Sequence, residues 1–414
     1  MKVRETALSI GRSAVADMVP DRAVRDGLSD FRPSGRVILV AIGKAAWSMA
    51  KAAWETIGDR IEDGIVITKD GHAEGPVGPL VIREASHPVI DERALAATDE
   101  ALSMVSGLSV DDTVLFLVSG GGSALFEKPI DGVSLSDLQD ISSHLMNAGA
   151  DIVTLNAVRK RLSRVKGGRF AHAAAPARIE ALILSDVLGD RLDSIASGPA
   201  APDLITSAEV RETVRRFGLA DNPVIQRALN EETPKSVDNV VSRIIGSVSV
   251  LCARTEELLR ESGIQTTLLT TRLSGEAREI GRLMAEIAVE IRESGRPASP
   301  PCAILAGGES VVHVRGDGLG GRNQEMALAA ARGIEGLENV AFLALASDGT
   351  DGPTDAAGGI VDGGSIVRMR SAGVDPLDLL QNNDAYHALE SAGDLVRTGP
   401  TGTNVNDIAL LLVG

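Results

Sequence analysis

The segment from Val114 to Leu125 constrains the fold of this chain more than any other. Its first residues, Val114 to Val118, form an apolar run with the length and composition of a buried strand. The next residues, Ser119-Gly120-Gly121-Gly122-Ser123, interrupt that run, and helix-forming residues follow. This pattern predicts a strand, a tight turn and the start of a helix. Backbone N–H groups at such a turn lack intrahelical partners, so this glycine loop is a candidate for binding a phosphate or carboxylate group.

The chain is acidic and poor in aromatic residues. It has 414 residues, a formal net charge of −16 and an aromatic content of 2%. A nucleic-acid surface needs clustered Lys and Arg, so this composition argues against a nucleic-acid partner. A small anionic ligand needs only local cations and remains compatible with it. The length predicts two or three domains, and a hydrophobic content of 44% supplies enough apolar residues for large cores.

The cysteines and the apolar segments predict the compartment. Cys252 and Cys302 lie inside apolar runs without the spacing of a metal site, so we expect buried, reduced thiols. The first residues lead into an amphipathic pattern and not into the core of a signal peptide. No apolar stretch is long enough to span a bilayer. We therefore expect a cytoplasmic protein with no membrane partner. The sequence leaves the oligomeric state open, including a homodimer.

Strand and helix patterns alternate through the first half of the chain. The expected strands cover residues 36–42, 64–68, 80–84, 114–118 and 180–184. Helical patterns cover residues 3–18, 45–57, 94–105, 134–149 and 155–165. This alternation predicts an α/β fold whose first domain is a doubly wound, Rossmann-like and mostly parallel sheet.

A second, smaller α/β domain with a mixed sheet is expected in the other half. The polar segments 231–239 and 295–301 have the composition of linkers. We place the boundary near residue 236, with domains 1–236 and 237–414. Helices are expected from Thr255 and over 275–293 and 323–331. The expected strands are 247–252, 266–269, 302–306, 311–315 and 340–346.

Two cations are expected at the starts of helices. Lys44 follows the strand ending at Ile42, and Arg322 precedes the helix expected from Asn323. A cation at a helix start opposes the positive end of the helix dipole, at a cost of a few tenths of a kcal/mol. A solvated side chain is the alternative for each one alone. Two such cations, both beside glycine-rich turns, favour an anion site, since ligands of doubly wound sheets bind beyond the carboxyl ends of strands.

Carboxylates follow two further strands. Asp186 and Asp190 come after the strand expected at 180–184, and Asp348, Asp351 and Asp355 come after the strand at 340–346. Oxygen-rich loops of this kind suit Mg²⁺, which commonly binds one or two carboxylates together with substrate phosphates. Asp186 is also suited to accepting a proton from a hydroxyl group. Turns and helix caps are the alternative for these residues.

The remaining patterns are less specific. Asn156, Lys160 and Lys166 lie in a basic segment, for which a solvated helix face is the alternative. Ser86-His87-Pro88 precedes a helix and is compatible with a simple turn. The six histidines lack the spacing of a zinc site. No Walker A motif is present. Gly316, Gly318 and Gly321 match G-x-G-x-x-G only weakly, because no acidic strand end follows at the expected distance.

Several longer motifs together resemble a known family. In the same order and over nearly the whole chain, they are similar to those of the class II glycerate 2-kinases, which carry a C-terminal MOFRL domain. The motifs are Ser119 to Leu125, Asn156 to Gly168, Ser185 to Asp190, Gly320 to Glu325, Ser347 to Asp355 and Thr401 to Asp407.

The resemblance implies an activity. It implies transfer of the γ-phosphoryl group of ATP to the 2-hydroxyl of D-glycerate, with a divalent cation such as Mg²⁺, in a cleft between two α/β domains. It links Lys44 and Arg322 to catalysis, and we add Asp186 as a catalytic candidate and Asp190 and Asp351 as metal-binding candidates. Substrate and phosphate binding is predicted for the glycine loop (Ser119, Gly120, Gly121, Gly122 and Ser123) and for Asn156, Lys160, Lys166, Glu309, Asn323 and Asn404.

Two other activities stay open. Relatives of this family have been called hydroxypyruvate reductases, so an NAD(P)H-dependent reductase is one alternative. It lacks support from a dinucleotide-binding fingerprint after a strand. A noncatalytic module that binds a sugar acid or a nucleotide is the other, because a fold alone does not set function.

Overall fold

The computed structural model describes residues 2–414, which form two compact units. The first unit is Pro20–Ile245, and the second combines the segment that ends at Val19 with Gly246–Gly414. The sequence predicted one boundary near residue 236. The first unit differs from the predicted domain at its start and at its end. The N-terminal helix belongs to the second unit, and the last strand of the first sheet extends to Gly246.

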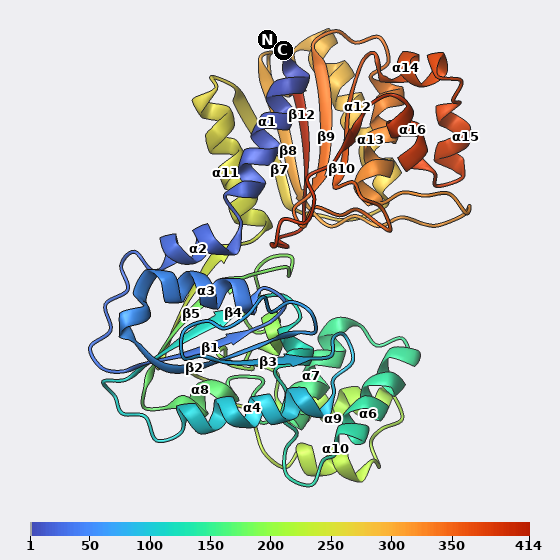
Figure 1. Cartoon of the computed structure of the whole chain (residues 1–414). Coiled ribbons are helices and arrows are strands. Elements are labelled where there is room, and N and C mark those ends of the chain that lie inside the picture. Colours follow the sequence, from blue (N-terminus) through green and yellow to red (C-terminus); the bar gives the residue numbers. More distant parts are fainter. Residues whose placement is uncertain (1) are drawn as a thin grey trace. The chain divides into compact units, whose positions relative to one another are not determined.

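The first unit contains a six-stranded sheet with the order β3-β2-β1-β4-β5-β6 (Figure 1). The pairs from β3 to β5 are parallel. This order is that of a doubly wound Rossmann-type sheet, so the predicted fold class is confirmed. The strands are β1 (Val37–Ile42), β2 (Ile61–Lys69), β3 (Val81–Ala85), β4 (Thr113–Val118), β5 (Arg178–Leu184) and β6 (Val240–Gly246).

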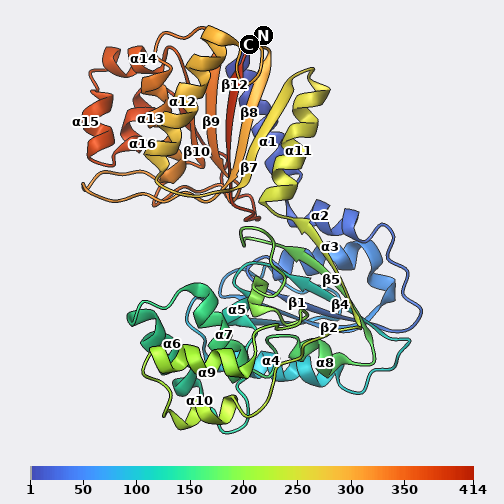
Figure 2. The same cartoon turned by 180° about the vertical axis from the view of Figure 1, so that it is seen from behind.

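Helices cover both faces of this sheet, as Figures 1 and 2 show. Alternate strand residues point to opposite faces. One core joins Val40 and Phe116 to α4 (Glu92–Val105) and α8 (Arg169–Ala174). The other joins Leu39 and Leu115 to α2 (Pro20–Gly27) and α3 (Ala46–Ile57). A separate helical cluster packs beside the sheet and contains α6 (Leu135–Asn147), α7 (Ile152–Leu162), α9 (Ser207–Arg216) and α10 (Pro223–Ala228).

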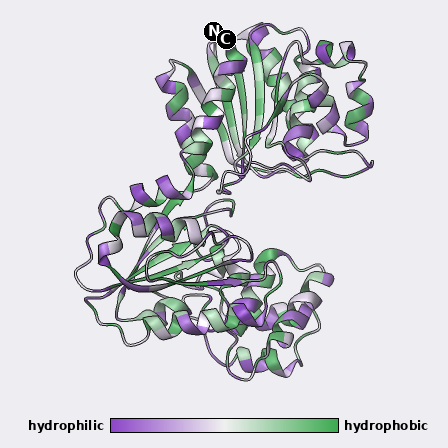
Figure 3. Cartoon of the chain, in the orientation of Figure 1, coloured by the Kyte–Doolittle hydropathy of each residue, from purple (hydrophilic) through white to green (hydrophobic). Residues whose placement is uncertain are grey.

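The second unit contains a mixed sheet with the order β11-β10-β9-β12-β8-β7. Only the β7–β8 pair is parallel among the pairs described, and β12 runs antiparallel to both of its neighbours. In Figure 3 hydrophobic residues concentrate in these strands. The strands are β7 (Gln265–Leu273), β8 (Cys302–Gly308), β9 (Val340–Ala346), β10 (Gly358–Asp362), β11 (Leu395–Val396) and β12 (Asp407–Val413).

The N-terminal helix α1 (Val3–Ala16) is part of the second unit. Arg4 in its first turn forms ion pairs of 3.1 Å with Asp362 and 2.8 Å with Asp394. With α11 (Val248–Glu261) it covers one face of the sheet (Figure 2). The other face packs against α12 (Ala277–Ser294), α13 (Arg322–Gly333), α14 (Ser365–Ser371), α15 (Pro376–Gln381) and α16 (Ala385–Ser391).

Two local predictions were wrong. Residues 247–252 were expected to form a strand, but Ser247 caps α11, and its side chain accepts a hydrogen bond from the Val250 N–H. The buried residues of α11 recur at helical spacing, and a short apolar run does not distinguish a strand from a buried helix. Residues 311–315 were also expected to form a strand. Only Val311 makes a β-bridge there, and β12 pairs with β8 instead.

Two other expectations can be compared with the structure. Cys252 and Cys302 are buried and unbridged, as expected, and burial raises the pKa of Cys252 to about 12. Both thiols therefore stay protonated and unreactive at neutral pH. Among residues 2–414, no helix is both long enough and apolar enough to cross a membrane.

We expect residues 20–245 to fold alone, whereas residues 20–236 should be markedly less stable. The shorter chain lacks β6, whose Val240 and Ile244 pack against the core of the first sheet. Its loss also exposes the edge of β5 to other chains. Chemical denaturation followed by circular dichroism measures the difference. Equal midpoints for the two chains would contradict the boundary at Ile245.

Candidate functional site

Two turns meet where the strand order of the first sheet reverses. The turn after β1 holds Gly43 and Lys44, and the turn after β4 holds the glycine loop, Ser119 to Ser123. In doubly wound sheets this switch point is where ligands bind. Hydrogen bonds join the two turns. The Lys44 N–H donates to the Gly120 carbonyl at 2.8 Å, and the Ala45 N–H donates to Ser119 Oγ at 3.0 Å.

Two positions at this junction, 43 and 120, require glycine because neighbouring groups occupy the space that a β-carbon would fill. Gly43 has a φ of +111° and a β-carbon there would overlap with Ser119. A β-carbon at Gly120 would overlap with the carboxylate of Asp186, which follows β5. Within the described chain, the N–H groups of Gly120 and Gly121 donate to no backbone carbonyl. These donors are available to a ligand, and the binding of an anion by the loop stays a prediction.

The Lys44 side chain is available for a ligand. It is half-buried, and among residues 2–414 it forms no ion pair with a carboxylate. Its backbone is fixed by Gly120 on one side and by the carbonyl contact to His72 Nδ1, at 2.9 Å, on the other. A positioned cation without a carboxylate partner, beside outward N–H groups, suits a phosphoryl or carboxylate oxygen.

The far end of the glycine loop is connected to α7. Ser123 Oγ lies 2.8 Å from Ser197 Oγ, which in turn donates to Asn156 Oδ1 at 3.3 Å. Arg159 donates to the Ser123 carbonyl at 3.2 Å. The structure therefore brings Asn156 to the loop, and its predicted role in ligand binding there stays a prediction. Arg159 forms no ion pair with a carboxylate among the described residues, so it is a second cation at this end of the loop.

Two lysines of the basic segment lie inside the protein. Lys160 is 2% exposed and pairs with Asp203 at 3.3 Å. Lys166 is 0% exposed, pairs with Glu127 at 3.1 Å and donates to the carbonyls of Ser123 and Phe126, both at 2.9 Å. Burial lowers the pKa of Lys166 to about 8, against the effect of Glu127. We expected both to contact an anion; their charges are instead matched within the protein, and Lys166 holds the glycine loop.

In the second unit, Arg322 is the first residue of α13 and is bound by two carboxylates. Its Nε donates to Asp407 at 2.6 Å, and its Nη1 donates to Glu309 at 2.6 Å. Burial acts to lower the pKa of Arg322, but the bonds to Asp407 outweigh it and raise that pKa. Burial raises the pKa of Asp407, and Arg322 opposes this rise. Glu309 is thus placed beside Arg322, where it holds the guanidinium.

Asp351 acts as a helix cap in this structure. Its carboxylate accepts the backbone N–H groups of Asn323 at 3.1 Å and Gln324 at 2.8 Å, at the start of α13. Asn323 is fully buried and its side chain also bonds Asp351. Burial raises the pKa of Asp351 to about 6 despite these bonds. We expected Asp351 to bind a metal ion and Asn323 to bind a ligand. In the structure the two residues contact each other, and Asp351 caps the start of α13.

The other acidic residues of that loop do not converge on one point. Asp348 accepts the Thr350 N–H, and Asp355 pairs with Arg397 at 2.9 Å. Asn404 is exposed and accepts the Asn406 N–H in the turn before β12. Within residues 2–414, no three His, Cys, Asp or Glu side chains are grouped to hold a metal ion. The residues present therefore do not form a metal cage by themselves.

Sequence analysis underestimated His87. A β-carbon at Gly121 would lie 3.2 Å from His87 Nε2 and 3.2 Å from Lys44 Cγ, so the two side chains flank Gly121. Burial and then the charge of Lys44 lower the pKa of His87. The Ser-His-Pro sequence alone resembles a turn. Its position two residues beyond β3 was the only signal that could have placed it at the same sheet edge.

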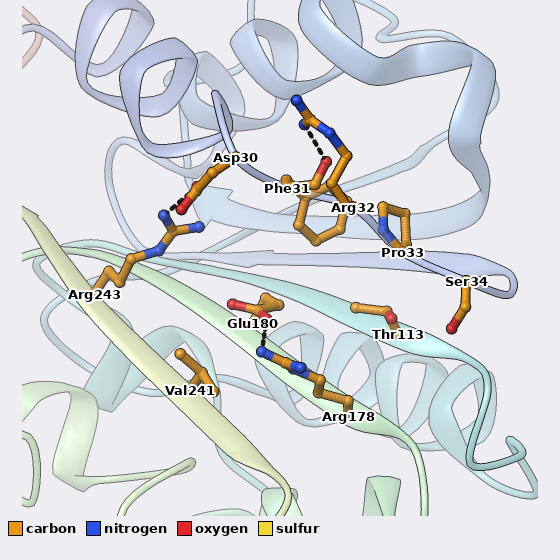
Figure 4. Close-up of a pocket in the computed structure, with 10 residues that line it drawn as sticks. All are labelled: Asp30, Phe31, Arg32, Pro33, Ser34, Thr113, Arg178, Glu180, Val241 and Arg243. Carbon is orange, nitrogen blue, oxygen red and sulfur yellow. Dashed lines mark hydrogen bonds and ion pairs between the residues drawn. The ribbon is translucent and has the colours of Figure 1, made fainter.

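A separate cavity of about 380 Å³ lies at the amino ends of β4 and β5 (Figure 4). Thr113 and Arg178 are the first residues of these strands, whereas the glycine loop and Asp186 follow their last residues. Its arginines already have partners: Arg243 pairs with Asp30 and Arg178 with Glu180, each at 2.6 Å. This cavity is therefore distinct from the site at the carboxyl ends.

The fold and the site define an α/β protein with a candidate anion site at the carboxyl edge of a doubly wound sheet. Comparisons with known proteins agree. Residues 6–230 match a domain of unknown function (DUF4147), and residues 302–407 match the MOFRL family. The chain is 50% identical to a D-glycerate 2-kinase of Thermotoga maritima, over 99% of this chain and 98% of that protein.

Two further relatives complete the comparison. The crystal structure of a glycerate kinase from Thermotoga maritima superposes with a TM-score of 0.96 at 50% identity, over 99% of both chains. A putative hydroxypyruvate reductase of Agrobacterium vitis is 41% identical over 100% of this chain and 95% of its own length. The chain belongs to the class II glycerate kinase family, with its DUF4147 and MOFRL regions.

We expect Lys166→Met to destabilise the first unit by about 3–5 kcal/mol. The substitution leaves Glu127 buried without its cation and removes the donor to the carbonyls of Ser123 and Phe126. Urea denaturation measures the loss. Adding Glu127→Gln should restore part of it, because the buried charge is then gone. A Lys166→Met protein as stable as the parent would show that this pair does not support the loop.

Proposed function

We propose that this protein is a D-glycerate 2-kinase, which transfers the γ-phosphoryl group of ATP to the 2-hydroxyl of D-glycerate and releases 2-phosphoglycerate and ADP. The observation that carries the proposal is the Lys44 site: a cation without a carboxylate partner beside the outward N–H groups of Gly120 and Gly121. The 50% identity to a D-glycerate 2-kinase over nearly the full length of both chains supports the choice of substrate.

Phosphoryl transfer needs positioning and charge stabilisation more than covalent chemistry by the protein. Lys44 neutralises charge on the transferring phosphoryl group, and the glycine loop donates N–H groups to an anionic oxygen. Asp186, which lies against Gly120, accepts the proton of the 2-hydroxyl. Arg322 stabilises charge as a guanidinium oriented by Asp407 and Glu309. Asn156 and Arg159 position the end of the loop through Ser197 and the Ser123 carbonyl.

A divalent cation such as Mg²⁺ is part of the proposal as the ion that accompanies ATP. Magnesium sites of this kind use phosphate oxygens and water with only one or two carboxylates, which agrees with the lack of a grouped metal cage in the described residues. Asp190 is the carboxylate we propose for it. Lys160 and Lys166 act indirectly through the glycine loop, and Asn323 and Asp351 act indirectly through the start of α13.

The reductase alternative is less well supported. The turn after β1, where a dinucleotide-binding loop would lie, reads Gly43-Lys44-Ala45-Ala46 and lacks the glycine pattern. The glycines of the weak match have another explanation. A β-carbon at Gly318 would lie 2.6 Å from the Asn382 carbonyl, and Gly316 also packs against Asn382, so both fit close packing within the second unit.

The purified protein should form 2-phosphoglycerate from ATP and D-glycerate. The assay couples product formation to enolase and pyruvate kinase without phosphoglycerate mutase, because enolase accepts the 2-isomer alone. A signal that requires added mutase would move the site of phosphorylation to the 3-hydroxyl. No signal with mutase, together with NADPH oxidation on hydroxypyruvate, would favour the reductase. Binding without turnover of either substrate would favour the noncatalytic module.

Lys44→Ala and Arg322→Ala should each reduce kcat by about 30- to 900-fold, which corresponds to about 2–4 kcal/mol of transition-state stabilisation. Steady-state kinetics of the folded variants measures the change. Lys51→Ala, on the helix that follows Lys44, and Arg332→Ala, on the helix that Arg322 begins, are matched controls, because each removes a cation nearby in the sequence and should leave kcat nearly unchanged. Turnover near that of the parent in either active-site variant would remove that residue from the mechanism.

A further inference from the structure

His87 lies at the proposed site but has no role in the mechanism above. It follows β3, and its ring and the Lys44 side chain both lie close to Gly121. Both His87 Nε2 and Lys44 Cγ are 3.2 Å from the position of a Gly121 β-carbon. A larger residue at position 121 would therefore displace one or both side chains. The three residues form one wall of the site.

The His87 ring is held at this place without using its ring nitrogens. It is half-buried, and within residues 2–414 neither nitrogen is recorded in a hydrogen bond. Its backbone neighbour Ser86 is fixed by the Asp91 carboxylate, which accepts the Ser86 N–H at 3.3 Å. The charged groups that face the ring are Lys44, Lys69 and His72. Neither nitrogen is buried, so both are open to water and to a ligand that enters the site.

We propose that the neutral imidazole of His87 binds substrate, donating a hydrogen bond from Nε2 to the anionic oxygen that Lys44 also contacts. This inference rests on the proposed kinase function. Burial and the neighbouring cations keep His87 neutral at neutral pH, since both lower its pKa. A weakened base is a poor proton acceptor but still a good donor, which assigns the acceptor role to Asp186. The oxygen belongs to the glycerate carboxylate or to a phosphoryl group of ATP.

The test compares three replacements of His87. The side-chain amide of Gln reaches the position of Nε2 and donates a hydrogen bond but cannot take up a proton. The amide of Asn reaches only the position of Nδ1. We expect His87→Ala and His87→Asn to lose about 10- to 100-fold in kcat/KM, as for a lost hydrogen bond to a charged group, and His87→Gln to retain most of it. His172→Ala, an exposed histidine on α8, is the control.

The Michaelis constants distinguish the two sources of the oxygen. A rise in KM confined to D-glycerate assigns the contact to the carboxylate, and a rise confined to ATP assigns it to a phosphoryl group. Equal kinetics for His87→Ala and the parent would overturn the proposal. So would a His87→Gln enzyme as impaired as His87→Ala, with the acidic limb of the pH profile lost in both, because that result requires a proton acceptor.

A second measurement separates this inference from the kinase function. Inorganic phosphate is titrated into the parent protein while the ring protons of its six histidines are followed by NMR. A phosphate-dependent shift of the signal that is missing in His87→Gln supports the contact even if the protein does not phosphorylate glycerate. A His87 signal that phosphate and D-glycerate both leave unchanged would overturn the inference, whatever the outcome of the kinase assay.

Discussion

The candidate site depends on the hydrogen bonds that join the turn after β1 to the turn after β4. Ser119 Oγ accepts the Ala45 N–H and donates to the Ile42 carbonyl, while the Gly120 carbonyl accepts the Lys44 N–H. These bonds satisfy the polar groups that face the sheet, and the remaining loop N–H groups point outward. They also require the backbones to approach so closely that Gly43 and Gly120 have no room for a side chain. Lys44 takes its position from this junction, and the side chains of Asp186 and His87 lie against Gly120 and Gly121 within it.

Pairing with carboxylates then distinguishes the cations that we propose to bind ligand from those that stabilise the fold. Two cations near the site have carboxylate partners: Lys160 has Asp203 and Lys166 has Glu127. A buried charge pair contributes little net stability, but losing one partner is costly, so these lysines are committed to the fold. Lys44 and Arg159 have no carboxylate partner among residues 2–414. In the first unit, the absence of a carboxylate partner is therefore the feature on which we propose Lys44 as an anion-binding cation.

The sequence predicted the strand, turn and helix around the glycine loop because local patterns determine such turns. Apolar runs gave β1, β4 and β5, and turn residues at their ends placed Lys44, Ser119 and Asp186 at one sheet edge. Contacts between residues far apart in the sequence could not be predicted. Periodicity could not show that α1 packs with a sheet formed by residues after 246, or that Lys166 has Glu127 as its partner. The mistaken strand at 247–252 has the same cause, since only packing distinguishes a buried helix from a strand.

The pairing of Arg322 with carboxylates is compatible with its proposed action on an anion. The carboxylate of Asp407 is largely buried and binds two nitrogens of the guanidinium, so it fixes the plane of the group. Glu309 binds Nη1 through a side chain that is about half exposed. An exposed ion pair contributes little, so an anionic ligand can replace Glu309 at small cost while Asp407 keeps the orientation. Lys44 needs no such arrangement because its turn already fixes its backbone. The two cations therefore reach the same kind of preorganisation by different routes, one through the backbone and one through a buried acid.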